Sequence, residues 1–115
     1  MPPREWRLWV EDIIVAIQKI LGYTENLSAD AFFADRKTLE AVLWNFTVIG
    51  EAARHIPPEV EAQYPAVPWQ AMRGMRNFII HEYPRVDPET IWNTTKDDLV
   101  PLLPLLKEAL AGGDA

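Results

Sequence analysis

The chain has 115 residues, of which 49% are apolar and 24% are charged, so it has the composition of an ordinary globular protein with room for one buried core. It contains no cysteine, which excludes disulfides and thiolate metal sites and favours the cytoplasm. Its net charge of −6 repels nucleic acid and anionic lipid, so a nucleic-acid-binding function needs a local basic site.

The sequence shows no signal for secretion or membrane insertion. Residues Met1–Trp9 carry charges among tryptophans, unlike the basic and then apolar start of a signal peptide. The longest apolar stretch, Leu99–Leu106, is interrupted by Pro101 and Pro104 and is far shorter than the roughly 20 residues that span a bilayer. We therefore expect a cytoplasmic protein with no membrane partner.

The first predicted element is a helix that begins near Pro3 and is stopped by Gly22. Apolar residues recur in it at steps of three and four: Trp6, Val10, Ile13, Ile14, Ile17 and Leu21. Ser28 can cap a short helical turn that follows.

A long helix is predicted next, capped by Asp35 and ended by Pro57 and Pro58. Its apolar positions are Leu39, Val42, Leu43, Phe46 and Ile49. Four prolines then fall within residues 57–68, which indicates an irregular connection with one helical turn around residues 59–63.

Two further helices complete the prediction. The fourth begins at Pro68 and runs to about His81, because Pro84 forces the preceding residue out of helical geometry. The last begins at Asp87, whose side chain caps the helix, and runs to Gly112 and Gly113, with a kink at Pro101.

No segment shows the alternation of apolar and polar residues that a strand requires. The sequence therefore predicts an all-α fold. We expect residues 1–115 to form one domain, an antiparallel up-and-down bundle of four main helices with short connecting helical turns.

On a helical wheel, the fourth helix has a core-facing stripe made of Met72, Met75, Phe78 and Ile79. Its polar side is formed by five other residues: Arg73, Arg76, Asn77, Ile80 and His81. Arg76 and His81 border this polar side. An apolar isoleucine in its middle suits contact with another subunit, although a singly exposed isoleucine is as ordinary.

Positive charge gathers in this part of the chain. Residues 68–86 contain Arg73, Arg76 and Arg85 against Glu82, a local charge of +2. A basic patch on an acidic body is a candidate phosphate site, and the alternative is a solvated helix face.

Arg76, His81 and Tyr83 form an R-x4-H-x-Y pattern, which resembles the signature of HEPN domains and in particular the HepT-like toxins. Flanking segments are similar to the family's usual wording, in order: 35–38 (DRKT), 49–54 (IGEAAR), 68–69 (PW), 75–77 (MRN), 81–83 (HEY), 86–87 (VD) and 91–92 (IW). The similarity extends from about Arg7 to Leu106.

The resemblance implies a helical dimer in which two copies of the motif line one cleft and act as a metal-independent endoribonuclease. It also implies a protein partner, an MNT-type nucleotidyltransferase antitoxin that silences the toxin by transferring AMP to Tyr83. Pro84 and Arg85 depart from the family pattern, in which many relatives have an aromatic residue and glycine. Arg85 adds a positive charge beside Tyr83.

The residue types suit this chemistry by themselves. Cleavage of RNA without a metal needs a base for the 2′-hydroxyl proton and a cation for the charged phosphorane, and His81 and Arg76 meet these needs. Four residues are candidates for binding RNA or its phosphates: Arg73, Asn77, Tyr83 and Arg85. Glu51 is a candidate for orienting an arginine or histidine, and an ordinary polar helix position is the alternative.

Structural interpretations compete with the functional ones. A histidine at a helix end can interact with the last carbonyls, which is the alternative for His81 and the prediction for His55. The tryptophans are predicted to fill core or interface positions. The two histidines show no metal-ligand spacing and there is no glycine-rich phosphate loop, so we expect no metal and no cofactor.

Two non-catalytic functions remain as alternatives to the ribonuclease toxin. The chain could be a protein-binding module that partners a nucleotidyltransferase and accepts a modification on Tyr83. It could also be a nucleotide-binding helical dimer. The acidic balance weakens the ribonuclease hypothesis relative to the protein-binding module.

Overall fold

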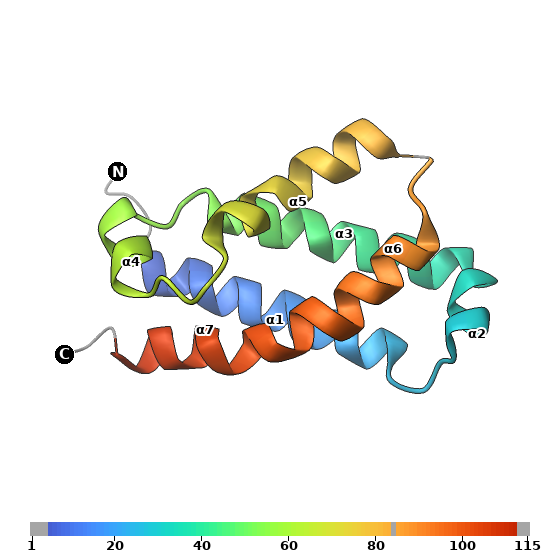
Figure 1. The fold of residues 1–115 in the computed structure, drawn as a ribbon, viewed down its shortest axis with the longest axis horizontal. Coiled ribbons are helices and arrows are strands. Elements are labelled where there is room, and N and C mark those ends of the chain that lie inside the picture. The colour runs from blue at the N-terminus through green and yellow to red at the C-terminus, as the bar shows by residue number, and fades with distance from the viewer. Residues whose placement is uncertain (1–4, 84, 113–115) are drawn as a thin grey trace.

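The computed structural model describes residues 5–83 and 85–112, and it confirms the all-α fold (Figure 1). The helices in chain order are α1 (Trp6–Thr24), α2 (Ala29–Phe33), α3 (Arg36–Ala53), α4 (Pro58–Gln63), α5 (Trp69–Glu82), α6 (Pro88–Asn93), the π-helical segment η1 (Thr94–Leu99) and α7 (Val100–Gly112). The expectations for Pro3, Pro84 and Gly113 lie outside the described residues.

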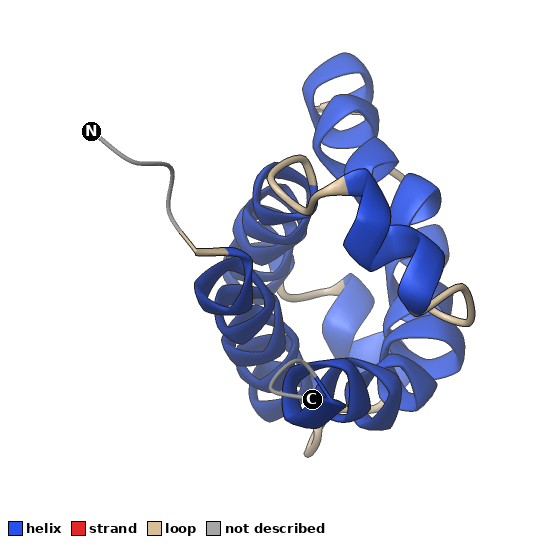
Figure 2. Ribbon diagram, turned by 90° about the vertical axis from the view of Figure 1, so that its left-hand side faces the viewer, coloured by secondary structure: helices blue, strands red, loops and turns tan. Residues whose placement is uncertain are grey.

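The four main helical segments are α1, α3, α5 and the C-terminal arm made of α6, η1 and α7. They run alternately in opposite directions along a molecule that is 45 Å long, as predicted (Figure 1). Figure 2, a view along this axis, shows helices joined by short loops, and the described residues contain no strand. None of the described helices is both long and apolar enough to cross a membrane.

The predicted caps are confirmed. Ser28 Oγ accepts a hydrogen bond of 3.1 Å from the backbone N–H of Ala31 at the start of α2. Asp35 caps α3 through Thr38, and Asp87 caps α6 through the N–H of Glu89. These bonds satisfy amide groups that have no partner inside the helix, which is why short polar residues begin these helices.

The prediction that Gly22 ends the first helix was wrong, because α1 continues to Thr24. Thr24 is fully buried, and its hydroxyl donates a hydrogen bond of 2.9 Å to the carbonyl of Ile20. A glycine inside a helix costs only about 1 kcal/mol relative to alanine, so the burial of this last turn outweighs the glycine.

The end of α3 also differs from the prediction. The helix ends at Ala53, ahead of the two prolines, and a tight turn brings Ile56 into the core. Pro57 then precedes α4 and Pro58 is its first residue, which confirms the predicted helical turn in this region. Pro68 likewise precedes α5 rather than beginning it.

A kink is predicted at Pro101, and the structure has the π-helical segment η1 directly before α7, which contains this proline. Proline lacks the N–H that would bond to the carbonyl one turn earlier, so Pro101 removes one hydrogen bond from the helix there. The wider turns of η1 lie on the N-terminal side of Pro101, and the arm continues beyond them as α7. Pro104 lies within α7.

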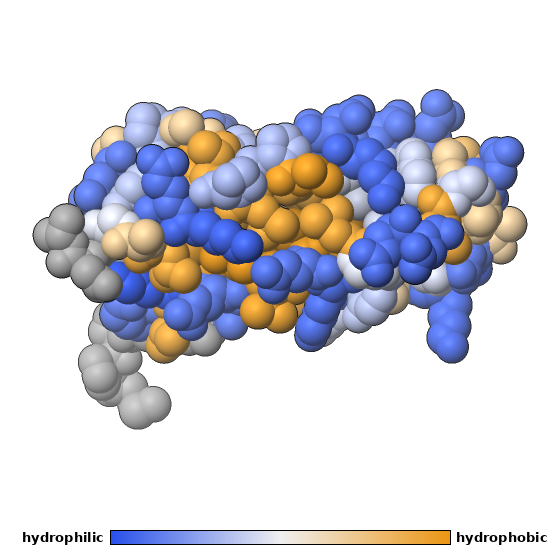
Figure 3. All heavy atoms as spheres, turned by 90° about the horizontal axis from the view of Figure 1, so that it is seen from below, coloured by the Kyte–Doolittle hydropathy of each residue, from blue (hydrophilic) through white to orange (hydrophobic). Residues whose placement is uncertain are grey.

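Buried apolar side chains from every described helix form one hydrophobic cluster. One fully or nearly fully buried residue from each, in chain order, is Val10, Phe32, Leu39, Val60, Met72, Ile91, Leu99 and Leu106. Figure 3, a view from below, also shows hydrophobic residues gathered in the middle of the surface on that face. The molecule therefore has a shared core, and it leaves apolar area accessible.

Candidate functional site

The residues of the R-x4-H-x-Y motif lie on α5 and directly after it. Arg76 and His81 are helical, and Tyr83 terminates the helix with an extended backbone, at φ −69° and ψ 135°. The N–H of Tyr83 still donates a hydrogen bond of 3.0 Å to the carbonyl of Ile79. The motif thus sits at a helix end, as predicted, and its tyrosine begins the loop.

The predicted core-facing stripe of α5 was partly wrong. Met72 and Ile79 are buried, but Met75 is only partly buried and the Phe78 side chain is exposed by 41%. Trp69 is buried instead. On the helical wheel, the buried side is turned by about 70° from the predicted one, toward Arg76.

The reason is a close approach of α5 to α3 at Gly50. A Cβ atom on Gly50 would lie 2.6 Å from the backbone nitrogen of Arg76 and 2.8 Å from its Cβ. Only a residue without a side chain allows this spacing. Arg76 consequently lies at the packed boundary between the two helices, and its side chain is 38% exposed.

Glu51, next to Gly50, contacts basic groups from α5 and from the turn that follows α3. Its carboxylate lies 3.5 Å from Arg76 Nε, 2.9 Å from Arg54 Nη1 and 3.2 Å from His55 Nε2. The hydrogen bond from His55 and the charges of both arginines lower the pKa of the Glu51 carboxyl from its ordinary value of 4.5. Glu51 is therefore ionised near neutral pH and contacts the motif arginine.

His55 does not behave as a histidine that binds the last carbonyls of its helix. Its imidazole stacks on the indole ring of Trp9, with centroids 4.1 Å apart and planes 9° apart, while Nε2 meets Glu51. The sequence did not suggest the stacking contact, because Trp9 is on α1 and is far from His55 along the chain. The Trp9, His55, Glu51 and Arg76 side chains therefore form a chain of contacts across α1, α3 and α5.

His81 is exposed, and within the described residues its imidazole makes no hydrogen bond or ion pair. Asn77 is exposed too. Ile80 is 53% exposed, in agreement with its predicted place on the polar side. Arg76 and His81 are five residues apart, which places them about 7.5 Å apart along the helix axis and about 140° around it. In one chain, the two side chains therefore leave α5 in different directions.

The remaining candidates are partly engaged. Arg73 Nη1 pairs with Glu61 of α4 at 2.5 Å, so its charge is compensated. Arg85 is exposed in the loop after α5. Arg36, at the start of α3, lies over the ring of Tyr83 with its Cζ 5.6 Å from the centroid. Arg36 was not among the predicted site residues, because no local pattern links it to Tyr83, which is 47 positions away along the chain.

The described residues contain no group of three or more His, Asp or Glu side chains placed to hold a metal ion. None of the motif residues lines the cavity of about 740 Å³ that lies on the other side of α5. Cationic and hydrogen-bonding side chains on an open surface can bind phosphate oxygens, and an imidazole can transfer a proton. The fold and site together define an all-helical protein with a basic motif at the end of its third long helix.

A family model described as "Ribonuclease HepT-like" matches residues 13–109, a range that includes Glu51 and the whole motif. The chain belongs to this family of HepT-like ribonucleases. The family assignment confirms the resemblance seen in the sequence.

Relatives of similar length support the assignment. The chain is 36% identical over 96 residues to a "Probable ribonuclease HepT" of Thermococcus cleftensis, which covers 84% of this chain and 87% of the relative. It is 32% identical over 112 residues to a "Putative RNase" of Methanocaldococcus jannaschii, with 94% and 93% covered. No solved structure matches significantly.

Proposed function

We propose that this protein is the toxin of a toxin–antitoxin pair and a metal-independent endoribonuclease that cleaves RNA with Arg76 and His81. His81 takes the proton of a 2′-hydroxyl, whose oxygen then attacks the adjacent phosphorus. Arg76 stabilises the charge of the phosphorane, and the bond to the 5′-oxygen breaks as that oxygen receives a proton. Residues 1–115 act as a single HEPN-like domain.

The observation that carries the proposal is the way the structure presents the two groups. Arg76 is fixed by the close packing at Gly50 and by the Glu51 carboxylate, yet more than a third of its side chain remains accessible. His81 is exposed and has no competing polar partner among the described residues. A fixed cation and an available imidazole are what such a reaction requires.

The different directions of Arg76 and His81 favour a composite site in a homodimer or higher oligomer. The sector of α5 between them contains the exposed Ile80. A second copy that packs on this sector buries the isoleucine and brings its own motif close to the first. Arg76 of one chain and His81 of the other then converge on one phosphodiester. That His81 takes the 2′-hydroxyl proton, and the His81 of the first chain gives a proton to the leaving 5′-oxygen.

Asn77, Tyr83 and Arg85 extend the RNA-binding surface beyond the reacting phosphate. Asn77 and Arg85 are exposed and offer donors to phosphate oxygens, and the half-exposed Tyr83 ring offers a stacking surface for a base. Arg73 joins this surface only when RNA displaces Glu61 from it. RNA binding to this basic site on an acidic protein is expected to weaken with salt.

We also propose that a nucleotidyltransferase antitoxin of the MNT type silences the protein by transferring AMP to Tyr83. The Tyr83 side chain is 49% exposed and lies just past the end of α5, where a second protein can reach it. The Arg36 guanidinium over its ring supplies a positive charge near a phosphate that becomes attached to the phenol oxygen.

The test is cleavage of tRNA and mRNA by the purified protein in the presence of EDTA. We expect wild type to cleave, His81→Ala and Arg76→Ala to lose cleavage, and Lys107→Ala to retain it, since Lys107 is an exposed cation on α7. Thermal unfolding of each variant checks that the fold is intact. Intact RNA with wild type, or cleavage by His81→Ala at the wild-type rate, would refute the proposal.

A non-catalytic module that binds a nucleotide or protein and partners a nucleotidyltransferase is the second candidate, favoured by the net charge of −6. It predicts that Tyr83 accepts AMP although wild type leaves all RNA intact. Calorimetry with ATP and AMP separates the nucleotide-binding form from the protein-binding form, because only the former gives a binding isotherm.

A further inference from the structure

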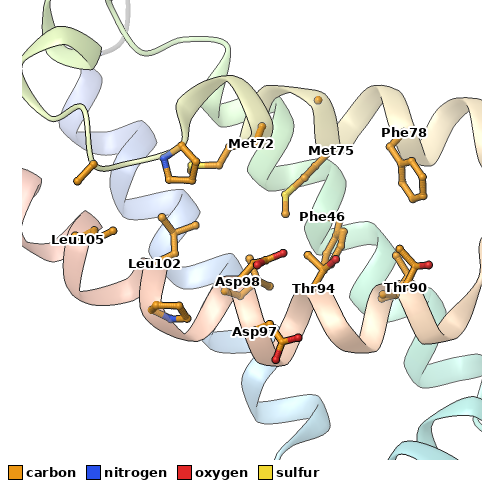
Figure 4. A pocket seen from close by; sticks show the side chains of 17 residues that line it. Phe46, Met72, Met75, Phe78, Thr90, Thr94, Asp97, Asp98, Leu102 and Leu105 are labelled. Carbon is orange, nitrogen blue, oxygen red and sulfur yellow. The ribbon is translucent and has the colours of Figure 1, made fainter.

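An open apolar groove runs between α5 and the C-terminal arm, where these two elements do not close on each other (Figure 4). Its volume is about 740 Å³. Side chains from α5 form one wall, side chains from α6, η1 and α7 form the other, and Phe46 of α3 contributes between them. The groove lies on the side of α5 away from the exposed Ile80.

The α5 wall is long and adaptable. Met72, Met75 and Phe78 point from it toward the C-terminal arm, as Figure 4 shows. Methionine side chains adjust to partners of different shape, which suits a protein-binding surface. Phe78 is 41% exposed, and together with Met72 and Met75 it contributes to a contiguous apolar surface.

The charged side chains that line the groove are all negative among the described residues. Among the described residues that line it, Asp97 and Asp98 carry the charges, and both are exposed. The neighbouring cation, Lys96, is directed elsewhere, with its Nζ 4.6 Å from the centroid of the Trp92 ring and 3.4 Å from the hydroxyl of Thr24. The π-helical segment thus presents its carboxylates to the groove and its ammonium group to α1.

The dimensions suit a short helix. The lining residues of α5 extend from Ala71 to Phe78, which is about 10 Å or two helical turns, and Pro68, just before α5, lengthens this wall to about 15 Å. An amphipathic helix binds such a groove with apolar residues at steps of three and four, and basic residues beside that stripe would meet the acidic edge.

A second copy of this chain is a poor fit. Phe78 and Ile80 are separated by about 160° around α5, so one partner surface cannot cover both. If copies associate through the Ile80 sector, the groove stays open in the oligomer. The described residues that line the groove include no basic side chain, so Asp97 and Asp98 would then have no neutralising partner in the groove.

We propose that this groove is a docking site for a basic amphipathic helix of another protein. The inference does not depend on RNA cleavage, since none of the motif residues lines the groove. Because α5 carries both the groove wall and the motif, the bound helix packs directly against the motif helix.

The test uses the full chain and two matched peptides of about 14 residues, each with leucines on one helical face and either lysines or glutamates beside them. Calorimetry is expected to show binding of one lysine peptide per chain and at least about tenfold weaker binding of the glutamate peptide. The double variant Asp97→Lys, Asp98→Lys is expected to reverse this preference. This charge exchange replaces exposed residues only, so the fold is retained.

The apolar contact is tested with Phe78→Ser, which is expected to weaken binding of the lysine peptide at least about tenfold. Ile80→Ser is the matched control on the opposite side of α5 and is expected to bind the peptide as wild type does. Sedimentation of the same variants reports the oligomeric state.

Three results would overturn the proposal. The first is a dissociation constant for the lysine peptide weaker than about 1 mM. The second is an unchanged peptide preference in the charge-exchange variant. The third is dissociation of a wild-type oligomer by Phe78→Ser and not by Ile80→Ser, which would assign the groove to a second copy of this chain.

Discussion

Replacement of Gly50 by alanine tests whether the contact between α3 and α5 positions the motif. The new Cβ would lie 2.6 Å from the backbone nitrogen of Arg76, whereas such atoms normally stay about 3.5 Å apart. The atom it meets belongs to the backbone, so no side-chain rotation relieves the clash. The two helices must separate by about 1 Å at this point.

The effect on stability combines two opposing terms. Overpacking of this kind costs about 1–3 kcal/mol, and the higher helix propensity of alanine returns about 1 kcal/mol. Gly74→Ala is the matched control, because a Cβ at Gly74 meets no atom within 4 Å. It is expected to stabilise the protein by about 0.5–1 kcal/mol, so the two variants should differ by about 1–3 kcal/mol.

The assays are thermal or urea unfolding for stability and the EDTA cleavage assay for function. A shift of about 1 Å at Arg76 is expected to lower cleavage by about 100-fold, while Gly74→Ala retains wild-type activity. If Gly50→Ala is as stable as Gly74→Ala and cleaves RNA at the wild-type rate, the packing at Gly50 does not position the motif arginine.

Three further outcomes are expected. In mixtures of His81→Ala and Arg76→Ala chains, subunit exchange restores part of the cleavage lost by each variant alone, as a composite site requires. Glu51→Gln lowers stability at neutral pH by less than about 1 kcal/mol, because the Glu51 and Arg76 side chains are 40% and 38% exposed and solvent screens their interaction. Since the folded state lowers the pKa of Glu51, this contribution is present above pH 4.5 and is lost as the pH falls through the lower folded-state value, so the two proteins converge in acid unfolding series. Arg36→Ala slows AMP transfer to Tyr83, measured by intact mass, and leaves RNA cleavage unchanged.

Each of these outcomes has a contrary result. Mixtures as inactive as their components would mean that both motif groups act from one chain. A stability difference at Glu51 that persists in acid would mean that its charge is not the cause. Equal modification rates with and without Arg36, in a wild type that is modified, would remove the role given to that arginine.

The sequence alone determined the features that depend on neighbours within about four residues along the chain. Ser28, Asp35 and Asp87 identified helix starts, because their side chains bond to amides two or three residues later. The R-x4-H-x-Y spacing gave the family and placed the motif at a helix end.

The exact orientation of α5 could not be read from its own residues. Its wheel has apolar side chains over a wide arc, and a periodic pattern does not distinguish Met75 and Phe78 from Trp69 as the buried members. The close approach of α5 to Gly50 determines which side of α5 is buried, and that glycine is on another helix, α3.

Only the tertiary structure brought together the residues around the motif arginine. Glu51 and Arg76 are 25 positions apart, and Trp9 meets His55 from a third helix. The groove between α5 and the C-terminal arm likewise exists because two elements fail to close on each other. Such contacts depend on how helices rotate and approach in space, and the local hydrogen bonds that define each helix do not specify that arrangement.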